Sequence, residues 1–279
     1  MKYFNGKVAA ITGAASGIGK ALAIELATRK CHLALSDVDQ AGLDKAKEEL
    51  LTYGVKVTTQ RVDVADEKQV HNWADNVVKE HGKVNFIFNN AGVAMGGSVE
   101  CSSYADYEWI LGINLWGVIY GTKAFLPYIK ETKDGHIINI SSVFGIFSQP
   151  TQSGYNMSKF AVRGFTESLR QELDILKSGV SATCVHPGGI KTNIAQNARM
   201  LDSMSSFTGG DNIDAMKEKF ESLFLTTPEK AAKKILASVV DDKRRVLVGP
   251  DAYVLDIMQR GLPVSYQKLV TASFNFASR

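Results

Sequence analysis

Short runs of apolar residues alternate with longer amphipathic segments along most of the chain. The apolar runs predict strands at residues 7–12, 31–36, 55–64, 84–88, 135–140, 180–185 and 245–248. Apolar residues at helical spacing predict helices at residues 17–29, 40–53, 67–81, 107–131, 154–177 and 228–240. Uninterrupted apolar strands that alternate with helices are typical of a parallel sheet buried on both faces. We therefore expect an α/β fold with a doubly wound parallel sheet of about seven strands and helices on both faces.

No segment of the chain has the composition of a linker between domains. The sequence lacks runs rich in proline, glycine and serine, and it lacks internal repeats. We expect a single domain over residues 1–279. Within it, residues 190–226 form an irregular, partly helical insert, and residues 250–279 show no clear pattern.

Composition narrows the class of protein without identifying a function. Of the 279 residues, 45% are hydrophobic and 22% are charged, as in an ordinary globular protein. The net charge of +3 is too small to indicate a nucleic-acid partner. Three cysteines lie far apart, so we expect neither a metal site nor a disulfide framework. The most apolar stretch, residues 109–121, is shorter than the roughly 20 residues of a membrane span, and we expect a cytoplasmic protein.

A glycine-rich turn follows the first predicted strand and opens the first predicted helix. Glycines here allow a tight turn and let a pyrophosphate approach the backbone, while the helix N-terminus supplies free N–H groups. The spacing is G-x-x-x-G-x-G rather than the general G-x-G-x-x-G, so the glycines alone are also compatible with an ordinary turn. The residues expected to contact a dinucleotide here are Gly13, Ser16, Gly17, Ile18 and Gly19.

Asp37 ends the second predicted strand and bears on the choice of dinucleotide. A carboxylate in this position accepts hydrogen bonds from ribose hydroxyls and repels a 2′-phosphate, which favours NAD over NADP. Lys20 and Arg29 are nearby bases, but neither directly follows the second strand, where an arginine that binds a 2′-phosphate is expected. The alternative interpretation of Asp37 is a solvated loop residue.

Further polar turns follow the third and fourth predicted strands. Asp63 and Val64 come after the third strand, where we expect contact with the adenine. Asn90, Ala91 and Gly92 come directly after the fourth. Because the carboxyl ends of parallel strands meet at one edge of a sheet, we expect these turns to line one binding site.

Taken together, these motifs and several downstream ones resemble the classical short-chain dehydrogenase/reductase family. The matching segments are TGAASGIG (12–19), Asp37, Asp63–Val64, NNAG (89–92), Asn114, INISS (138–142), Tyr155-x-x-x-Lys159 and Pro187–Gly188 with Thr192. The motifs span residues 5–192, and the strand–helix order extends the resemblance to residues 228–250. The resemblance implies a Rossmann-type fold, an NAD(P)-dependent oxidoreductase that acts on small-molecule alcohols or ketones, and a homo-oligomer, either a dimer or a tetramer.

Tyr155 and Lys159 lie four residues apart and so share one face of a helix. By itself this pair is also common on helix surfaces. A nearby ammonium lowers the pKa of a tyrosine from about 10 toward the range useful for acid–base catalysis. The resemblance assigns proton exchange to Tyr155, ribose binding to Lys159 and positioning of the substrate oxygen to Ser142. It also implies that Asn114 interrupts its helix and holds a water linked to Lys159.

The resemblance further implies a nicotinamide site after the sixth predicted strand. Pro187–Gly188 would form its wall, the backbone of Ile190 would bind the carboxamide, and Thr192 would add a hydrogen bond to the same group. The sequence departs from the family at His186, where asparagine is commoner, and at Gly189, which adds flexibility. We expect His186 to be structural rather than catalytic.

Many apolar side chains lie where the family places its substrate lid, near residues 190–226. They are Ile194, Met200, Leu201, Met204, Phe207, Met216, Phe220, Leu223 and Phe224. Others lie near the expected catalytic residues: Val93, Met95, Trp116, Val143, Phe144, Ile146 and Phe147. We therefore expect a hydrophobic secondary alcohol or ketone as substrate. The alternative is that these residues pack on one another or form a subunit contact.

Two other functions remain open. One is an NADP-dependent 3-oxoacyl-carrier-protein reductase. Asp37 argues against it, and Lys191 and Arg199 give only a weak indication of the basic patch that a carrier protein would need. The other is a catalytically silent nucleotide-binding regulatory protein, and the intact Ser142, Tyr155 and Lys159 argue against that.

Overall fold

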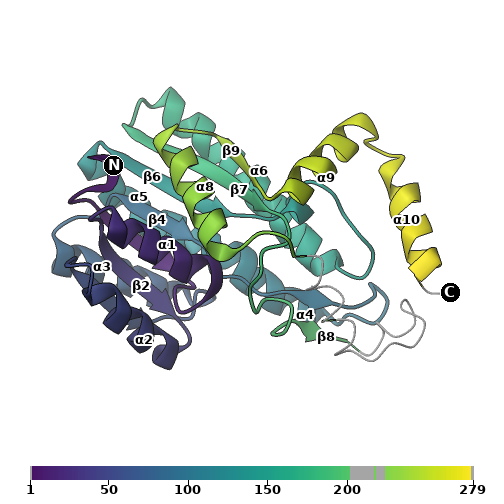
Figure 1. The fold of residues 1–279 in the computed structure, drawn as a ribbon, viewed down its shortest axis with the longest axis horizontal. Helices are drawn as coiled ribbons and strands as arrows, with labels where there is room; N and C mark the ends of the chain where they lie inside the picture. The colour runs from purple at the N-terminus through teal and green to yellow at the C-terminus, as the bar shows by residue number, and fades with distance from the viewer. Residues whose placement is uncertain (1, 202–216, 218–223, 278–279) are drawn as a thin grey trace.

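Seven parallel strands form the central sheet of the computed structural model, which describes residues 2–201, 217 and 224–277 (Figure 1). Their order is β3-β2-β1-β4-β6-β7-β9, and each neighbouring pair is parallel. The strands are β1 (Val8–Thr12), β2 (His32–Asp37), β3 (Val57–Arg61), β4 (Phe86–Asn89), β6 (Gly135–Ile140), β7 (Val180–Pro187) and β9 (Arg245–Val248). The α/β fold expected from the sequence is confirmed.

The order in which strands are added to the sheet reverses between β1 and β4. Strands β2 and β3 add on one side of β1, whereas β4, β6, β7 and β9 add on the other. In open α/β sheets, ligands bind outside the carboxyl ends of the strands at such a switch point. The last residues of β1 and β4, Thr12 and Asn89, lie at this place.

Helices cover both faces of the sheet and enclose one hydrophobic core on each. The helices are α1 (Gly17–Thr28), α2 (Gln40–Leu51) and α8 (Pro228–Val240) on one face, and α3 (Glu67–His81), α5 (Gly117–Thr132) and α6 (Ser153–Ile175) on the other. Alternate residues of β1 belong to different cores: Ala9 and Ile11 to the first, Val8 and Ala10 to the second. This two-sided burial explains why the strands are apolar without alternation.

Local sequence signals correctly predicted the bounds of several elements. The predicted bounds of α3, β6, α8 and β9 match the structure. Helix α3 begins where the Asp66 side chain accepts from Gln69 N and ends at Gly82, which has a φ of 76°. The third strand is shorter than predicted, since only residues 57–61 pair with β2.

The long helix predicted over residues 107–131 is divided into three parts. Helix α4 (Tyr104–Leu111) leads into a π-helical turn (Gly112–Trp116), and α5 follows directly. The interruption lies at Asn114, as the sequence predicted. Single π-helical turns often occur at functional sites.

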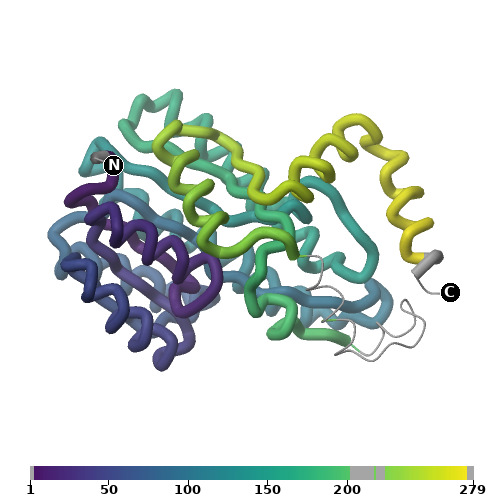
Figure 2. The backbone as a smooth tube through the Cα atoms, in the orientation of Figure 1, coloured from purple at the N-terminus to yellow at the C-terminus, as the bar shows by residue number. Residues whose placement is uncertain are grey.

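Two parts of the structure were not predicted from the hydrophobic pattern. Strands β5 (Met95–Gly96) and β8 (Arg199–Met200) form a separate two-stranded parallel sheet. The tail forms α9 (Pro250–Gly261) and α10 (Tyr266–Ala277), and α10 extends away from the main body (Figure 2). Much of the expected lid, including Met204, Phe207, Met216, Phe220 and Leu223, lies outside the described residues.

The described part of the chain has neither a membrane-spanning helix nor a metal-binding cluster. It contains no helix that is long and apolar enough to cross a membrane. Within the same residues, no group of three or more His, Cys, Asp or Glu side chains is placed to hold a metal ion.

Candidate active site

The glycine turn after β1 packs closely against the turn after β4. Gly13 has a φ of 65°, and a Cβ added there would lie 2.8 Å from Cα of Ala91. Thr12 Oγ1 accepts hydrogen bonds from the backbone N–H groups of Asn90 (2.9 Å) and Ala91 (3.0 Å). Asn90 Nδ2 in turn donates to the carbonyl oxygens of Thr12 and Gly13. Asn90 and Ala91, expected at a cofactor, therefore also fix the shape of the glycine turn.

The N-terminus of α1 is suited to a phosphate group. Its N-cap, Ser16, makes no side-chain capping hydrogen bond, so that side chain does not occupy the first N–H groups of the helix. A Cβ on Gly19 would lie 2.0 Å from the carbonyl oxygen of Gly13, so only glycine allows this close turn. Thr192 Cγ2 would lie 3.1 Å from a Cβ on Gly17, which places Thr192 beside the turn. The glycine turn and the free N–H groups of α1 therefore fit the pyrophosphate of a dinucleotide.

Asp37 lies at the end of β2 and holds the glycine turn. Its Oδ2 accepts from Ala15 N at 3.0 Å, and its Oδ1 accepts from Asp39 N at 3.1 Å. These bonds fix the carboxylate at the edge where a ribose would lie.

Asp63 and Val64 follow β3 at the same edge. Asp63 Oδ1 accepts from Ala65 N at 3.0 Å, whereas Val64 is buried against Gly117 of α5. Asp63 thus shapes its turn, and Val64 belongs to the core beneath it.

Ser142, Tyr155 and Lys159 come together where β6 ends and α6 begins. Ser142 is the N-cap of a short 3₁₀ turn, and its Oγ accepts from Phe144 N at 3.1 Å. Lys159 Nζ donates to the carbonyl oxygen of Ile140 at 3.1 Å and lies 5.6 Å from the centroid of the Tyr155 ring. All three side chains are buried.

Burial dominates the acid–base properties of this group. It raises the pKa of Tyr155 above 10, and a hydrogen bond with the Ser142 side chain acts in the opposite direction. It lowers the pKa of Lys159 to about 8, because an ammonium is unfavourable in an apolar environment. The spacing of Tyr155 and Lys159 predicts that Lys159 lowers the pKa of Tyr155. In this structure the net direction is upward, and Ser142 is the group that lowers it.

Asn114 joins the π-helical turn to the chain that follows β4. Its Oδ1 accepts from Val93 N at 2.8 Å, and its Nδ2 donates to Val93 O at 2.9 Å and to Ser158 Oγ at 3.2 Å. Gly92 lies between this side chain and Lys159: a Cβ on Gly92 would be 3.2 Å from Asn114 Oδ1 and 3.4 Å from Lys159 Nζ. The side chain of Asn114 is fully buried.

A model of the family described as short chain dehydrogenase matches residues 7–202. This chain belongs to the short-chain dehydrogenase family. It is an oxidoreductase with a nucleotide-binding fold, and the family uses NAD or NADP.

Relatives of known name and structure match nearly the whole chain. A protein named SadH from Mycobacterium tuberculosis is 48% identical over 273 residues, which cover 98% of this chain and 96% of SadH. Estradiol 17-beta-dehydrogenase 11 from Macaca fascicularis is 28% identical over 275 residues, or 98% of this chain and 85% of that enzyme. A short-chain dehydrogenase/reductase from Burkholderia phymatum, crystallised with NAD, superposes with a TM-score of 0.86 at 30% identity, covering 94% of this chain and 96% of that one.

The remaining family positions lie where β7 ends. His186 is fully buried, and its Nδ1 lies 2.9 Å from the carbonyl oxygen of Ser142. Since a carbonyl oxygen only accepts, Nδ1 carries the proton, and the histidine ties Ser142 to β7. Ile190 is buried and pairs with Thr226 through a single β-bridge. Gly188 and Gly189 contact the Asp251 side chain of α9.

Apolar side chains pack around Tyr155. Met95, Ile110 and Tyr155 form one buried cluster, against which Val93 and Phe144 pack. The Phe144 ring meets the Tyr155 ring edge to face, with centroids 6.0 Å apart. Trp116, predicted near this group, is 48% exposed and stacks on Tyr120.

Sequence reasoning missed two residues of the tail, Asp251 and Tyr266, which contact loops of this site. A signal for the first was present: Pro250 followed by an acidic residue is a common helix start. Nothing in the local pattern indicated that Tyr266 would contact the loop after Ser142.

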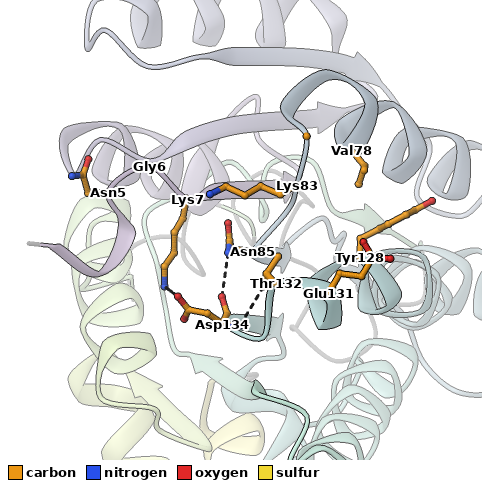
Figure 3. A pocket seen from close by; sticks show the side chains of 11 residues that line it. Asn5, Gly6, Lys7, Val78, Lys83, Asn85, Tyr128, Glu131, Thr132 and Asp134 are labelled. Carbon is orange, nitrogen blue, oxygen red and sulfur yellow. Dashed lines mark hydrogen bonds and ion pairs between the residues drawn. The ribbon is translucent and has the colours of Figure 1, made fainter.

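A groove lies at the opposite edge of the sheet. It has a volume of about 590 Å³ and is lined by residues that precede β1, β4 and β6, among them Lys7, Asn85 and Asp134 (Figure 3). Lys7 and Asp134 form an ion pair at 2.7 Å across it. Because these are the amino ends of parallel strands, the groove is far from the Ser142–Tyr155–Lys159 group.

Proposed function

We propose that the protein is an NAD-dependent dehydrogenase/reductase that transfers a hydride between nicotinamide and a hydrophobic secondary alcohol or ketone. The observation that carries this proposal is the buried Tyr155, which lies beside Ser142 and Lys159 and belongs to an apolar cluster with Met95 and Ile110. The family membership supports the reaction class.

The cofactor would be held along the carboxyl edge of the sheet. The turn after β1 would take the pyrophosphate, Asp37 the adenosine ribose, Lys159 the nicotinamide ribose, and residues 187–192 the nicotinamide itself. The remaining contacts come from Asp63, Val64, Asn90, Ala91 and Gly92. When bound, the cofactor supplies the hydride acceptor or donor.

Proton transfer is assigned to the side chains of the chain itself. In the reducing direction the Tyr155 hydroxyl donates its proton to the substrate oxygen, and in the oxidising direction the phenolate takes it back. The Ser142 hydroxyl holds the same oxygen. Lys159 would hold the nicotinamide ribose, and Asn114, through a water, would connect Lys159 to solvent.

Two features support the finer choices of cofactor and substrate. A 2′-phosphate would face the Asp37 carboxylate, which is already fixed by Ala15 N and Asp39 N. The negative charges of the phosphate and the carboxylate would repel each other, which favours NAD. The cluster of Met95, Ile110 and Phe144 beside Tyr155 favours an apolar substrate.

The test combines binding with turnover. A panel of secondary alcohols and ketones is monitored at the nicotinamide absorbance, and NADH and NADPH are titrated by fluorescence. We expect tighter NADH binding and faster turnover of apolar substrates. Tyr155→Phe should abolish turnover while NADH binding is retained, and Tyr104→Phe, at an 89% exposed position, serves as the control. Retained activity in Tyr155→Phe, or equal affinity for NADPH, would contradict the proposal.

We expect a homo-oligomer, either a dimer or a tetramer. Trp116, Met157 and Phe160 are 48%, 43% and 39% exposed at the π-helical turn and on α6, and exposed large apolar side chains favour self-association. Light scattering after size-exclusion chromatography measures the mass, and a monomer would contradict this expectation.

A further inference from the structure

The tail of the chain contacts two loops of the candidate active site. We call α9 and α10 together, residues 250–277, the C-terminal hairpin. Its two helices lie beyond β9 and form the right-hand part of the molecule in Figure 1. The first contact is with residues 187–190, the cofactor loop, and the second is with residues 143–149, the serine loop.

Asp251 makes the contact with the cofactor loop. It lies in the first turn of α9, and its Oδ2 accepts from Gly189 N at 2.6 Å. A Cβ on Gly188 would lie 2.1 Å from Oδ2, so the carboxylate occupies the space of a side chain at 188. Gly249 has a φ of 100°, and a Cβ there would lie 2.5 Å from Oδ1. The two glycines therefore allow the carboxylate to reach the loop backbone.

Tyr266 makes the contact with the serine loop. It is 6% exposed, and its hydroxyl oxygen accepts from Ser148 N at 3.2 Å. Its ring lies 6.1 Å from that of Phe147, which lies 5.2 Å from Phe144, whose ring contacts Tyr155. Packed aromatic rings thus run from α10 to the tyrosine proposed to exchange the proton.

We propose that the C-terminal hairpin positions both loops: Asp251 sets the backbone of the cofactor loop, and Tyr266 sets the serine loop and with it the apolar wall beside Tyr155. The assignment of the loops to cofactor and substrate rests on the proposed function. Asp251 and Tyr266 are positioning residues, because each acts through a loop. Their effects are separable, since one loop is expected at the cofactor and the other at the substrate.

The first experiment examines Asp251. Asp251→Ala removes the acceptor for Gly189 N, whereas Asp251→Asn keeps an oxygen that can accept the same bond. We expect the alanine variant to bind NADH about tenfold more weakly and the asparagine variant to stay within about threefold of the parent. Hydrogen exchange of the cofactor loop should accelerate only in the alanine variant. Asp241→Asn, at an exposed surface ion pair, is the matched control.

The second experiment examines Tyr266. Tyr266→Phe keeps the ring and removes only the oxygen that Ser148 N bonds, so exchange at residues 147–149 should accelerate by about tenfold. NADH affinity should not change, while KM for apolar substrates should rise more than kcat falls. Tyr253→Phe, at a 45% exposed position on α9, is the control and should leave every readout unchanged.

The outcomes separate this proposal from the proposed function. If no alcohol or ketone is turned over, the proposed function fails, but the exchange rates of both loops still test the hairpin. The proposal is overturned if Asp251→Ala leaves NADH affinity and cofactor-loop exchange unchanged, or if Tyr266→Phe leaves serine-loop exchange unchanged. It is also overturned if both variants change both loops equally, because that result indicates general destabilisation.

Discussion

The ammonium of Lys159 lies in a buried environment, where a charge is unfavourable. The side chain is 4% exposed, and its Nζ donates to the Ile140 carbonyl oxygen. Burial lowers its pKa to about 8, below the ordinary value of 10.5. A buried charged group at a functional site commonly lowers the free energy of unfolding. Its replacement by an apolar residue commonly raises that free energy. Lys159 has this character.

Replacement of Lys159 by methionine should stabilise the fold while it abolishes turnover. A lowered pKa in the folded state means that stability is smallest below pH 8 and rises as the pH increases toward 10.5. Lys159→Met should remove this rise and add about 1–2 kcal/mol at pH 7. Urea unfolding at pH 7 and pH 9.5 measures both effects, with the exposed Lys123→Met as control. A less stable variant at pH 7 would be the contrary result.

At the scale of the elements, the glycines of α5 and α6 differ in the space that surrounds them. Gly121 of α5 lies against β4, where a Cβ would be 2.0 Å from Asn89 Oδ1. Asn89 Nδ2 donates to Thr122 Oγ1 and to Asn139 Oδ1, so its amide cannot turn away without breaking buried hydrogen bonds. Gly164 of α6 is exposed, and a Cβ there would meet nothing within 4 Å.

The same substitution at these two glycines should therefore have opposite effects. Gly121→Ala should destabilise the protein by about 2 kcal/mol or more, because the added methyl group overlaps a fixed buried amide. Gly164→Ala should stabilise it by about 0.5–1 kcal/mol, because alanine restricts the unfolded chain and fits an α-helix. Thermal unfolding of the two variants beside the parent measures both. A gain at 121 or a loss at 164 would contradict the packing described here.

At the scale of the whole molecule, buried histidines link the fold to pH. Burial lowers the pKa of His136, which contacts Thr183 Oγ1, and of His186, which contacts Ser142 O, to about 4 each. The same cause lowers the pKa of the partly buried His81 to about 4. In the unfolded chain these groups titrate near pH 6.5. Protonation therefore favours the unfolded chain at acidic pH.

We expect stability to fall as the pH decreases from about 6.5 toward 4. A lowered histidine pKa contributes stability above the unfolded value, and this contribution is lost as the pH approaches the folded value. For a fully buried histidine the upper limit is about 3 kcal/mol. Urea unfolding between pH 7 and pH 4 measures the slope. His136→Gln should reduce it, the exposed His71→Gln should not, and a flat profile in the parent would refute the argument.

The sequence by itself determined the succession of elements and the identity of the residues in the proposed site. Hydrophobic periodicity and caps act over a few residues, so α3, β6, α8 and β9 were predicted at their observed bounds. The motif order likewise predicted the family. The roles assigned to Ser142, Tyr155 and Lys159 stay predictions, although the structure brings their side chains together.

Only the tertiary structure decided how these residues are held. Asp251 bonds Gly189 across 62 residues, and Tyr266 bonds Ser148 across 118, distances at which no local pattern carries information. The upward direction of the Tyr155 pKa also required the folded chain, because burial depends on packing from many segments. Local chemistry selects elements and motifs, whereas solvation and long-range contacts exist only once the chain has folded.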